Sequence, residues 1–141
     1  MGPPAAEPVG LVLARTAKVV SRAFDDALVA AGGSLPTWLI LVSLRQGRHG
    51  AQRELAEAVG IEGPTLTHHL NRMEAGGLVT RARDPANRRV HQVELTEAGA
   101  EAFSRLLGAV TTFDRTLRRG LSRAEVDHLD GLLARLRANV G

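Results

Sequence analysis

The chain has 141 residues, enough for one compact domain with a helical extension but short for two independent cores. Hydrophobic residues make up 44% of the sequence and charged residues 23%, which is typical of a folded globular protein rather than a disordered one. Cysteine is absent, and this excludes disulfides, iron–sulfur clusters and thiol nucleophiles.

The formal net charge is +3, and 17 of the 18 cationic side chains are arginines, Lys18 being the exception. An arginine-rich sequence is consistent with phosphate binding. It is equally consistent with G+C-rich codons, which favour Arg, Ala and Gly. Composition therefore does not distinguish phosphate binding from codon bias, and the positions of the arginines in the sequence have to be considered.

No segment predicts a membrane span or a secretory leader. The longest uninterrupted run of aliphatic and aromatic residues, 38–42, has five residues, whereas a membrane helix needs about 20. Residues 1–8 contain three prolines and lack a basic stretch before an apolar one, so we expect a disordered N-terminus and no signal peptide. We expect a cytoplasmic protein that does not contact membranes.

Apolar residues recur at helical spacing through most of the chain. They predict a long first helix over residues 9–31 and a second from Leu35 to Gly47, followed by a helix over 52–59 and another from about Gly63-Pro64 to Gly76-Gly77. The period then changes, and residues 78–83 and 90–95 predict a β-hairpin around the turn 84–87. Thr96 is placed to cap a helix that continues to Gly120, and Ser122 and Glu125 form a capping box for the last helix.

Residues 54–70 have the spacing of a helix-turn-helix. Ala56 is small where two helices would cross, and Gly60 permits the positive φ of the turn. The shared core would be formed by Leu55, Val59, Ile61, Leu66 and Leu70. The outer side of the second helix carries Pro64, Thr65, Thr67, His68, Asn71 and Arg72, where a DNA major groove would lie. The alternative is an ordinary helical hairpin with a solvated face.

The hairpin that follows favours DNA binding. Residues 81–89 have a local net charge of +3, because they contain four arginines and one acidic residue, Asp84. The arginines are Arg81, Arg83, Arg88 and Arg89. A basic hairpin directly after a recognition helix is typical of a winged helix. Its tip can place a guanidinium in the minor groove, and Arg88 is our candidate for that contact.

At these residues the sequence resembles the multiple antibiotic resistance regulator (MarR) family. The resemblance covers Leu55-Ala56, Thr65-Leu-Thr67, residues 73–79 and residues 81–99. The wing signature of that family is Asp-x-Arg followed, after five residues, by Leu-Thr. The sequence here has Asn87-Arg88-Arg89 and then Leu95-Thr96, so it departs from the family at Asn87. The resemblance implies that Arg89 braces the wing through residue 87, with Asp84 as a substitute acid, and that Arg88 contacts DNA.

The resemblance also implies a mainly α fold in which long terminal helices form a dimerisation region. That region would comprise residues 9–34 and 97–141, and residues 35–96 would form the winged helix-turn-helix domain. Large apolar side chains at Phe24, Phe103, Leu117, Leu129, Leu133 and Leu136 agree with this, because leaving each in water would cost about 1.5–3 kcal/mol. We expect a homodimer that reads a palindrome with half-sites about 10 bp apart.

Affinity and sequence specificity are assigned to different residues. Arg53, Arg81 and Arg83 are expected to contact phosphates, and Thr65, Thr67, His68 and Arg72 to contact base edges. Arg72 is equally consistent with a phosphate contact.

Members of this family commonly respond to small aromatic or anionic ligands held where the dimer helices meet the winged helix. Arg15, Lys18 and Arg22 could supply cations for such a ligand, Trp38 an aromatic wall, and His69 a sensing group. The plainer alternatives are that Trp38 belongs to the core, that the cations are solvated, and that His69 is a buried, hydrogen-bonded histidine.

Two further classes of function are weighed against DNA binding. One is a winged helix used for protein interaction. The other is a helical metalloenzyme, suggested by His68-His69 and by the i, i+3 pair Glu125 and His128. Adjacent helical residues point about 100° apart and cannot chelate one ion in the usual way, a di-iron bundle needs two such pairs, and no catalytic motif is present. We expect a repressor with no cofactor, no metal and no enzymatic activity.

Overall fold

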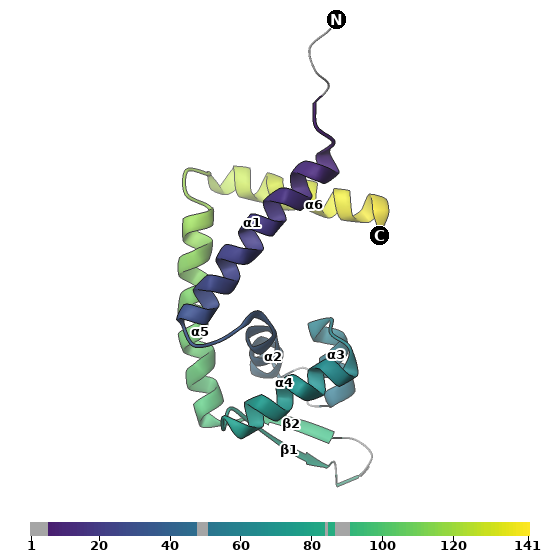
Figure 1. The fold of residues 1–141 in the computed structure, drawn as a ribbon, viewed down its shortest axis with the longest axis vertical. Coiled ribbons are helices and arrows are strands. Elements are labelled where there is room, and N and C mark those ends of the chain that lie inside the picture. The colour runs from purple at the N-terminus through teal and green to yellow at the C-terminus, as the bar shows by residue number, and fades with distance from the viewer. Residues whose placement is uncertain (1–5, 48–50, 84, 87–90) are drawn as a thin grey trace, which may run out of the picture. The chain divides into compact units, whose positions relative to one another are not determined.

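A computed structural model describes residues 6–47, 51–83, 85–86 and 91–141, and within these ranges it contains six α-helices and one two-stranded sheet (Figure 1). The elements, in chain order, are α1 (Val9–Ala30), α2 (Leu35–Arg45), α3 (Gln52–Val59), α4 (Gly63–Ala75), β1 (Val79–Arg83), β2 (His91–Leu95), α5 (Glu97–Leu117) and α6 (Arg123–Val140). The predicted mainly α winged helix is thereby confirmed. Outside the described residues lie residues 1–5 of the segment expected to be disordered, residues 84 and 87 of the predicted turn, and residues 88–90 after it.

The chain forms two compact units, one ending at Val110 and the other running from Thr111 to Gly141, with the boundary inside α5. The core of the first unit collects buried side chains from α1 to α5 and from both strands. Its largest fully buried members are Leu28, Ile40, Leu41, Leu55, Leu66, Leu70, Leu106 and Val79. Predicted helix-turn-helix core residues Leu55, Leu66 and Leu70 are therefore buried, and Val59 and Ile61 are half-buried against them.

The hairpin is antiparallel, with Val79 opposite Leu95 and Arg81 opposite Val93. Ala51, just before α3, adds one bridge to Gln92 on the other side of β2. The start of α3 is thus connected to the wing through the main chain.

The junction between the hairpin and α5 is closely packed. The Thr96 hydroxyl donates to the Gly77 carbonyl at 2.6 Å and accepts from the Gly99 N–H at 3.0 Å, which confirms the predicted cap. Position 99 has room only for glycine, because a Cβ there would lie 2.1 Å from the Leu78 carbonyl oxygen. The long helix α5 therefore begins at a fixed point on the wing.

The second unit contains the end of α5 and all of α6. Ser122 caps α6 by accepting from the Glu125 N–H at 3.1 Å, and the Glu125 carboxylate accepts from the Ser122 N–H at 2.9 Å, so the predicted capping box is confirmed. No residue from 111 to 141 is buried within this unit. Within the unit, its apolar side chains are therefore left largely uncovered.

No described helix is by itself long and apolar enough to cross a bilayer; taken together, only the pair α1 and α2, which bends by 74°, reaches the required length and composition.

Candidate nucleic-acid interface

The turn between α3 and α4 has the geometry that the sequence predicts for a helix-turn-helix. Gly60 ends α3 with φ +76°, a left-handed conformation that glycine adopts without strain. Glu62 then precedes α4, whose first turn contains Pro64 at a tolerated position. Of the predicted outer-face residues, five are exposed and one is half-buried; the exposed ones are Pro64, Thr65, His68, Asn71 and Arg72.

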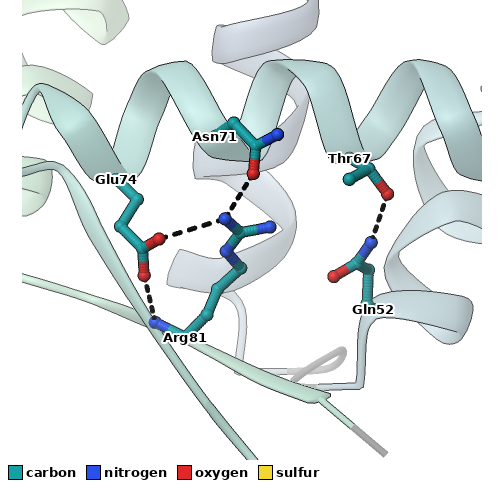
Figure 2. Close-up of polar contacts among 5 residues, drawn as sticks. All are labelled: Gln52, Thr67, Asn71, Glu74 and Arg81. Carbon is teal, nitrogen blue, oxygen red and sulfur yellow. Dashed lines mark hydrogen bonds and ion pairs between the residues drawn. The ribbon is translucent and has the colours of Figure 1, made fainter.

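The half-buried member is Thr67, whose hydroxyl is already engaged within the protein (Figure 2). Gln52, at the start of α3, donates from Nε2 to Thr67 Oγ1 at 2.7 Å, and Thr67 donates to the Gly63 carbonyl at 3.0 Å. Because a hydroxyl carries one proton, Thr67 retains only acceptor capacity and its methyl group for a ligand. The bond from Gln52 also holds the start of α3 against α4.

Arg81 connects the wing to the recognition helix (Figure 2). Its guanidinium Nη2 donates to Glu74 Oε1 at 3.0 Å and to the carboxamide oxygen of Asn71, while its main-chain N–H donates to Glu74 Oε2 at 3.1 Å. The Arg81 side chain is 18% exposed and that of Glu74 is 41% exposed. The hydrogen bond from the Arg81 side chain lowers the pKa of Glu74 below its usual 4.5, with smaller contributions from the Arg81 main chain and charge.

The other predicted phosphate contacts remain accessible. Arg53 near the start of α3 and Arg83 at the end of β1 are both exposed. Four residues with predicted wing roles lie outside the described residues: Asp84, Asn87, Arg88 and Arg89. The assignments of wing bracing and of the minor-groove contact therefore stay predictions.

The five residues predicted to bind an effector do not gather at one site. Arg15 pairs with Glu7, while Lys18 and Arg22 line a shallow hollow on one face of α1 with Asp25 and Asp26. Trp38 is only 9% exposed and belongs to the core, which is the second of the two interpretations that the sequence left open.

Half-buried His69 and exposed Arg72 line a hollow of about 400 Å³ between α4 and the segment that joins α1 to α2. The hollow is completed by Gly32, Gly33, Ser34, Pro36, Thr37, Met73 and Leu78. Of the predicted effector residues, His69 is the one that lies here. Arg72, predicted to contact DNA, is its cationic group.

Among the described residues, no three His, Asp or Glu side chains are grouped so as to hold a metal ion. The imidazoles of His68 and His69 lie edge to face, with ring centroids 5.8 Å apart.

Sequence reasoning missed Glu74 and Gln52, the residues that hold Arg81 and Thr67. A signal for Glu74 is present, because it lies in the last turn of the recognition helix, seven residues before an arginine of opposite charge. Alternation along β1 places Arg81 on the same face as the buried Val79 rather than on the solvent face. Together these two features would have indicated an internal partner for Arg81.

Comparison with known proteins agrees with this geometry. Residues 34–91 match the model of the MarR family. The fold is shared with the transcriptional repressor CouR, solved bound to a 23-mer DNA duplex, at 28% sequence identity and a TM-score of 0.83, over 92% of each chain. A probable transcriptional regulator from Pseudomonas aeruginosa is 28% identical (TM-score 0.78; 92% of this chain and 97% of that one). A MarR-family regulator from Rhodococcus sp. RHA1 is 25% identical (TM-score 0.78; 91% of both). The resemblance found in the sequence is thereby confirmed.

Proposed function

We propose, from the match of residues 34–91 to the MarR-family model, that the chain is a homodimeric, DNA-binding transcriptional repressor of a palindromic operator. The observation that carries the proposal is the exposed polar face of α4, which lies beside the strands of a basic hairpin (Figure 1). A likeness of 28% identity to a repressor solved on duplex DNA supports it. Bound over a promoter, such a protein occludes transcription, and we expect it to act in the cytoplasm.

In this proposal α4 enters the major groove. Thr65, His68 and Arg72 are exposed and can reach base edges, and Thr67 can contribute its methyl group and a lone pair. Pro64 starts the helix close to the phosphate backbone, where Arg53 and Arg83 grip phosphates. We assign Arg88 to the minor groove and wing bracing to Asp84, Asn87 and Arg89.

Dimerisation is proposed from apolar surface that each of the two units leaves exposed. On α1, Val9 and Val19 are 64% and 71% exposed. In the second unit the exposed apolar residues are Leu117, Leu121, Leu129, Leu132, Leu136 and Val140. Burying a fully exposed large apolar side chain contributes about 1.5–3 kcal/mol, and a partly exposed one contributes less. A symmetric pair is the commonest way for identical chains to cover such surface. We therefore assign residues 9–34 and 97–141 to the dimer contact and residues 35–96 to DNA.

We further propose that an aromatic or anionic small molecule releases the operator. The hollow beside α4 offers a cation at Arg72, an imidazole at His69 and hydroxyls at Ser34 and Thr37. A ligand held there acts on the recognition helix directly, and it shifts the equilibrium only by its different affinity for free and DNA-bound forms. A panel of aromatic acids should raise the melting temperature and release bound duplex; if every compound fails in both assays, no effector acts at this hollow.

The main proposal is tested by titrating the full chain with labelled duplex DNA at several salt concentrations. DNA binding through phosphate contacts weakens steeply as salt rises, because each contact releases condensed counterions. A protein-interaction module would show no saturable duplex binding at low salt, and that result would refute the proposal.

A further inference from the structure

The Arg81 side chain is half-buried, with 18% of its surface exposed, in a hairpin where a free cation would be expected to contact phosphate. It shares a strand face with Val79, which is 1% exposed, and stands opposite Val93, which is 2% exposed. Arg83, two residues on, is exposed. The two arginines of β1 therefore differ in exposure, and we do not assign them the same role.

Glu74 fixes Arg81 at two points. One carboxylate oxygen accepts from the main chain of Arg81 and the other accepts from its guanidinium. Because Arg81 is held both at its main-chain N–H and at its guanidinium, its side chain has little rotational freedom. Its position relative to α4 is thus determined by the last turn of that helix.

The contact between Arg81 and Asn71 determines how the Asn71 carboxamide is oriented. A guanidinium has five N–H donors and no acceptor, so the atom of Asn71 that faces it must be the oxygen. Figure 2 shows that oxygen directed at Arg81 and the carboxamide nitrogen directed away from it. Asn71 is exposed and follows His68 by three residues, so it lies on the neighbouring part of the outer face of α4.

Resting on the function proposed above, we propose that Arg81 is a positioning residue, held by Glu74, that orients Asn71 so that its NH₂ group donates to an acceptor on a DNA base edge. In the major groove such acceptors are O6 and N7 of guanine, N7 of adenine and O4 of thymine. Cytosine presents only a donor there. One position of each half-site should therefore disfavour cytosine on the contacted strand, although Asn71 was not among the predicted base readers.

The alternative is that Arg81 releases Glu74 on binding and grips a phosphate, as the sequence suggested. The two roles differ in salt dependence. A lost phosphate contact lowers the slope of log affinity against log salt by about one, whereas a lost positioning residue leaves that slope unchanged. Arg83→Ala provides the matched control on the same strand, and it should show the lower slope.

The decisive experiment selects bound sequences from a random duplex pool with the wild type, Asn71→Ala, Arg81→Ala and the double variant. We expect Asn71→Ala to lose about 3- to 10-fold of preference at one position per half-site, the range that one hydrogen bond supplies. Arg81→Ala should relax the same position, and the double variant should relax it no further, because the two residues act as a unit. Asn71→Ala changes only an exposed residue, so it remains informative if Arg81→Ala does not fold.

The outcomes separate this inference from the proposed function. If the wild type enriches no sequence, the proposed function fails and the inference fails with it. If the wild type enriches a palindrome that Asn71→Ala leaves unchanged at every position, the inference alone is overturned. A reduced salt slope for Arg81→Ala, equal to that of Arg83→Ala, would likewise overturn it in favour of the phosphate contact.

Discussion

The indole of Trp38 stacks on the ring of Phe103, with centroids 5.4 Å apart and planes inclined by 7°. Trp38 belongs to α2 of the winged helix and Phe103 to α5, the helix that leads out of the first unit. Close by, a Cβ at Gly33 would lie 2.6 Å from a Leu106 methyl carbon, so the segment before α2 also packs tightly on α5. These contacts fix the orientation of the winged helix on the first part of α5.

Replacing Phe103 with alanine should destabilise the first unit by about 2–4 kcal/mol, because it removes the stacking partner of Trp38 and leaves a cavity in a half-buried site. Trp38 is the single tryptophan, so its fluorescence during denaturant unfolding reports on this contact directly. Glu101→Ala, at an exposed position of the same helix, serves as the control. Equal midpoints for the two variants would show that the stack does not stabilise the fold.

Gly99→Ala should destabilise the protein by about 1–3 kcal/mol or more, because the added methyl group meets the Leu78 carbonyl oxygen at the start of α5. Gly63→Ala is the matched control, since nothing lies within 4 Å of a Cβ at that position and its φ is not positive. Alanine also favours a helix over glycine, so the control should be as stable as the wild type or slightly more stable. Thermal unfolding in the absence of DNA distinguishes the two. A wild-type melting temperature for Gly99→Ala would contradict the packing at this junction.

The contact between Glu74 and Arg81 should make stability depend on pH in the acidic range. The pKa of Glu74 is lowered in the folded state from 4.5, so its stabilising contribution is fully present above about pH 4.5 and is lost as the pH falls through the folded-state pKa. Glu74→Gln should therefore be less stable than the wild type at neutral pH, and the difference should shrink in acid. Unfolding free energies measured across this range check the trend, with Glu57→Gln as a control for the loss of one exposed carboxylate. A difference that stays constant into acid would contradict it.

Leu129→Glu should convert the proposed dimer to monomer, since it places a charge on the apolar side of α6. Asp127→Ala is the control, because residue 127 lies roughly opposite residue 129 around a helix. Sedimentation at micromolar concentration measures both. If Leu129→Glu sediments as a dimer, α6 does not form the contact.

The helix limits could be predicted because local chemistry determines them. Gly60 ends α3 through its backbone conformation, and Ser122 and Glu125 start α6 through hydrogen bonds within four residues. The core of the helix-turn-helix could also be predicted, since Leu55, Leu66 and Leu70 follow helical spacing.

The partners of side chains at the candidate site could not be predicted in the same way. Whether Arg81 reaches phosphate or Glu74 depends on how β1 lies against α4, to which it is joined through residues 76–78. The sequence also left Trp38 between an effector wall and the core. Its contact with Phe103, 65 positions away, places it in the core, and no local pattern encodes such a distance.

The most direct test of the central claim is selection of sequences bound by the full-length protein from a random duplex pool. Two winged helices held by one symmetric dimer should enrich a palindrome whose half-site centres lie about 10 bp apart, one turn of B-form DNA. Enrichment of a single unrepeated half-site would contradict the dimeric arrangement. Recovery of no preferred sequence at low salt would contradict sequence-specific DNA binding altogether.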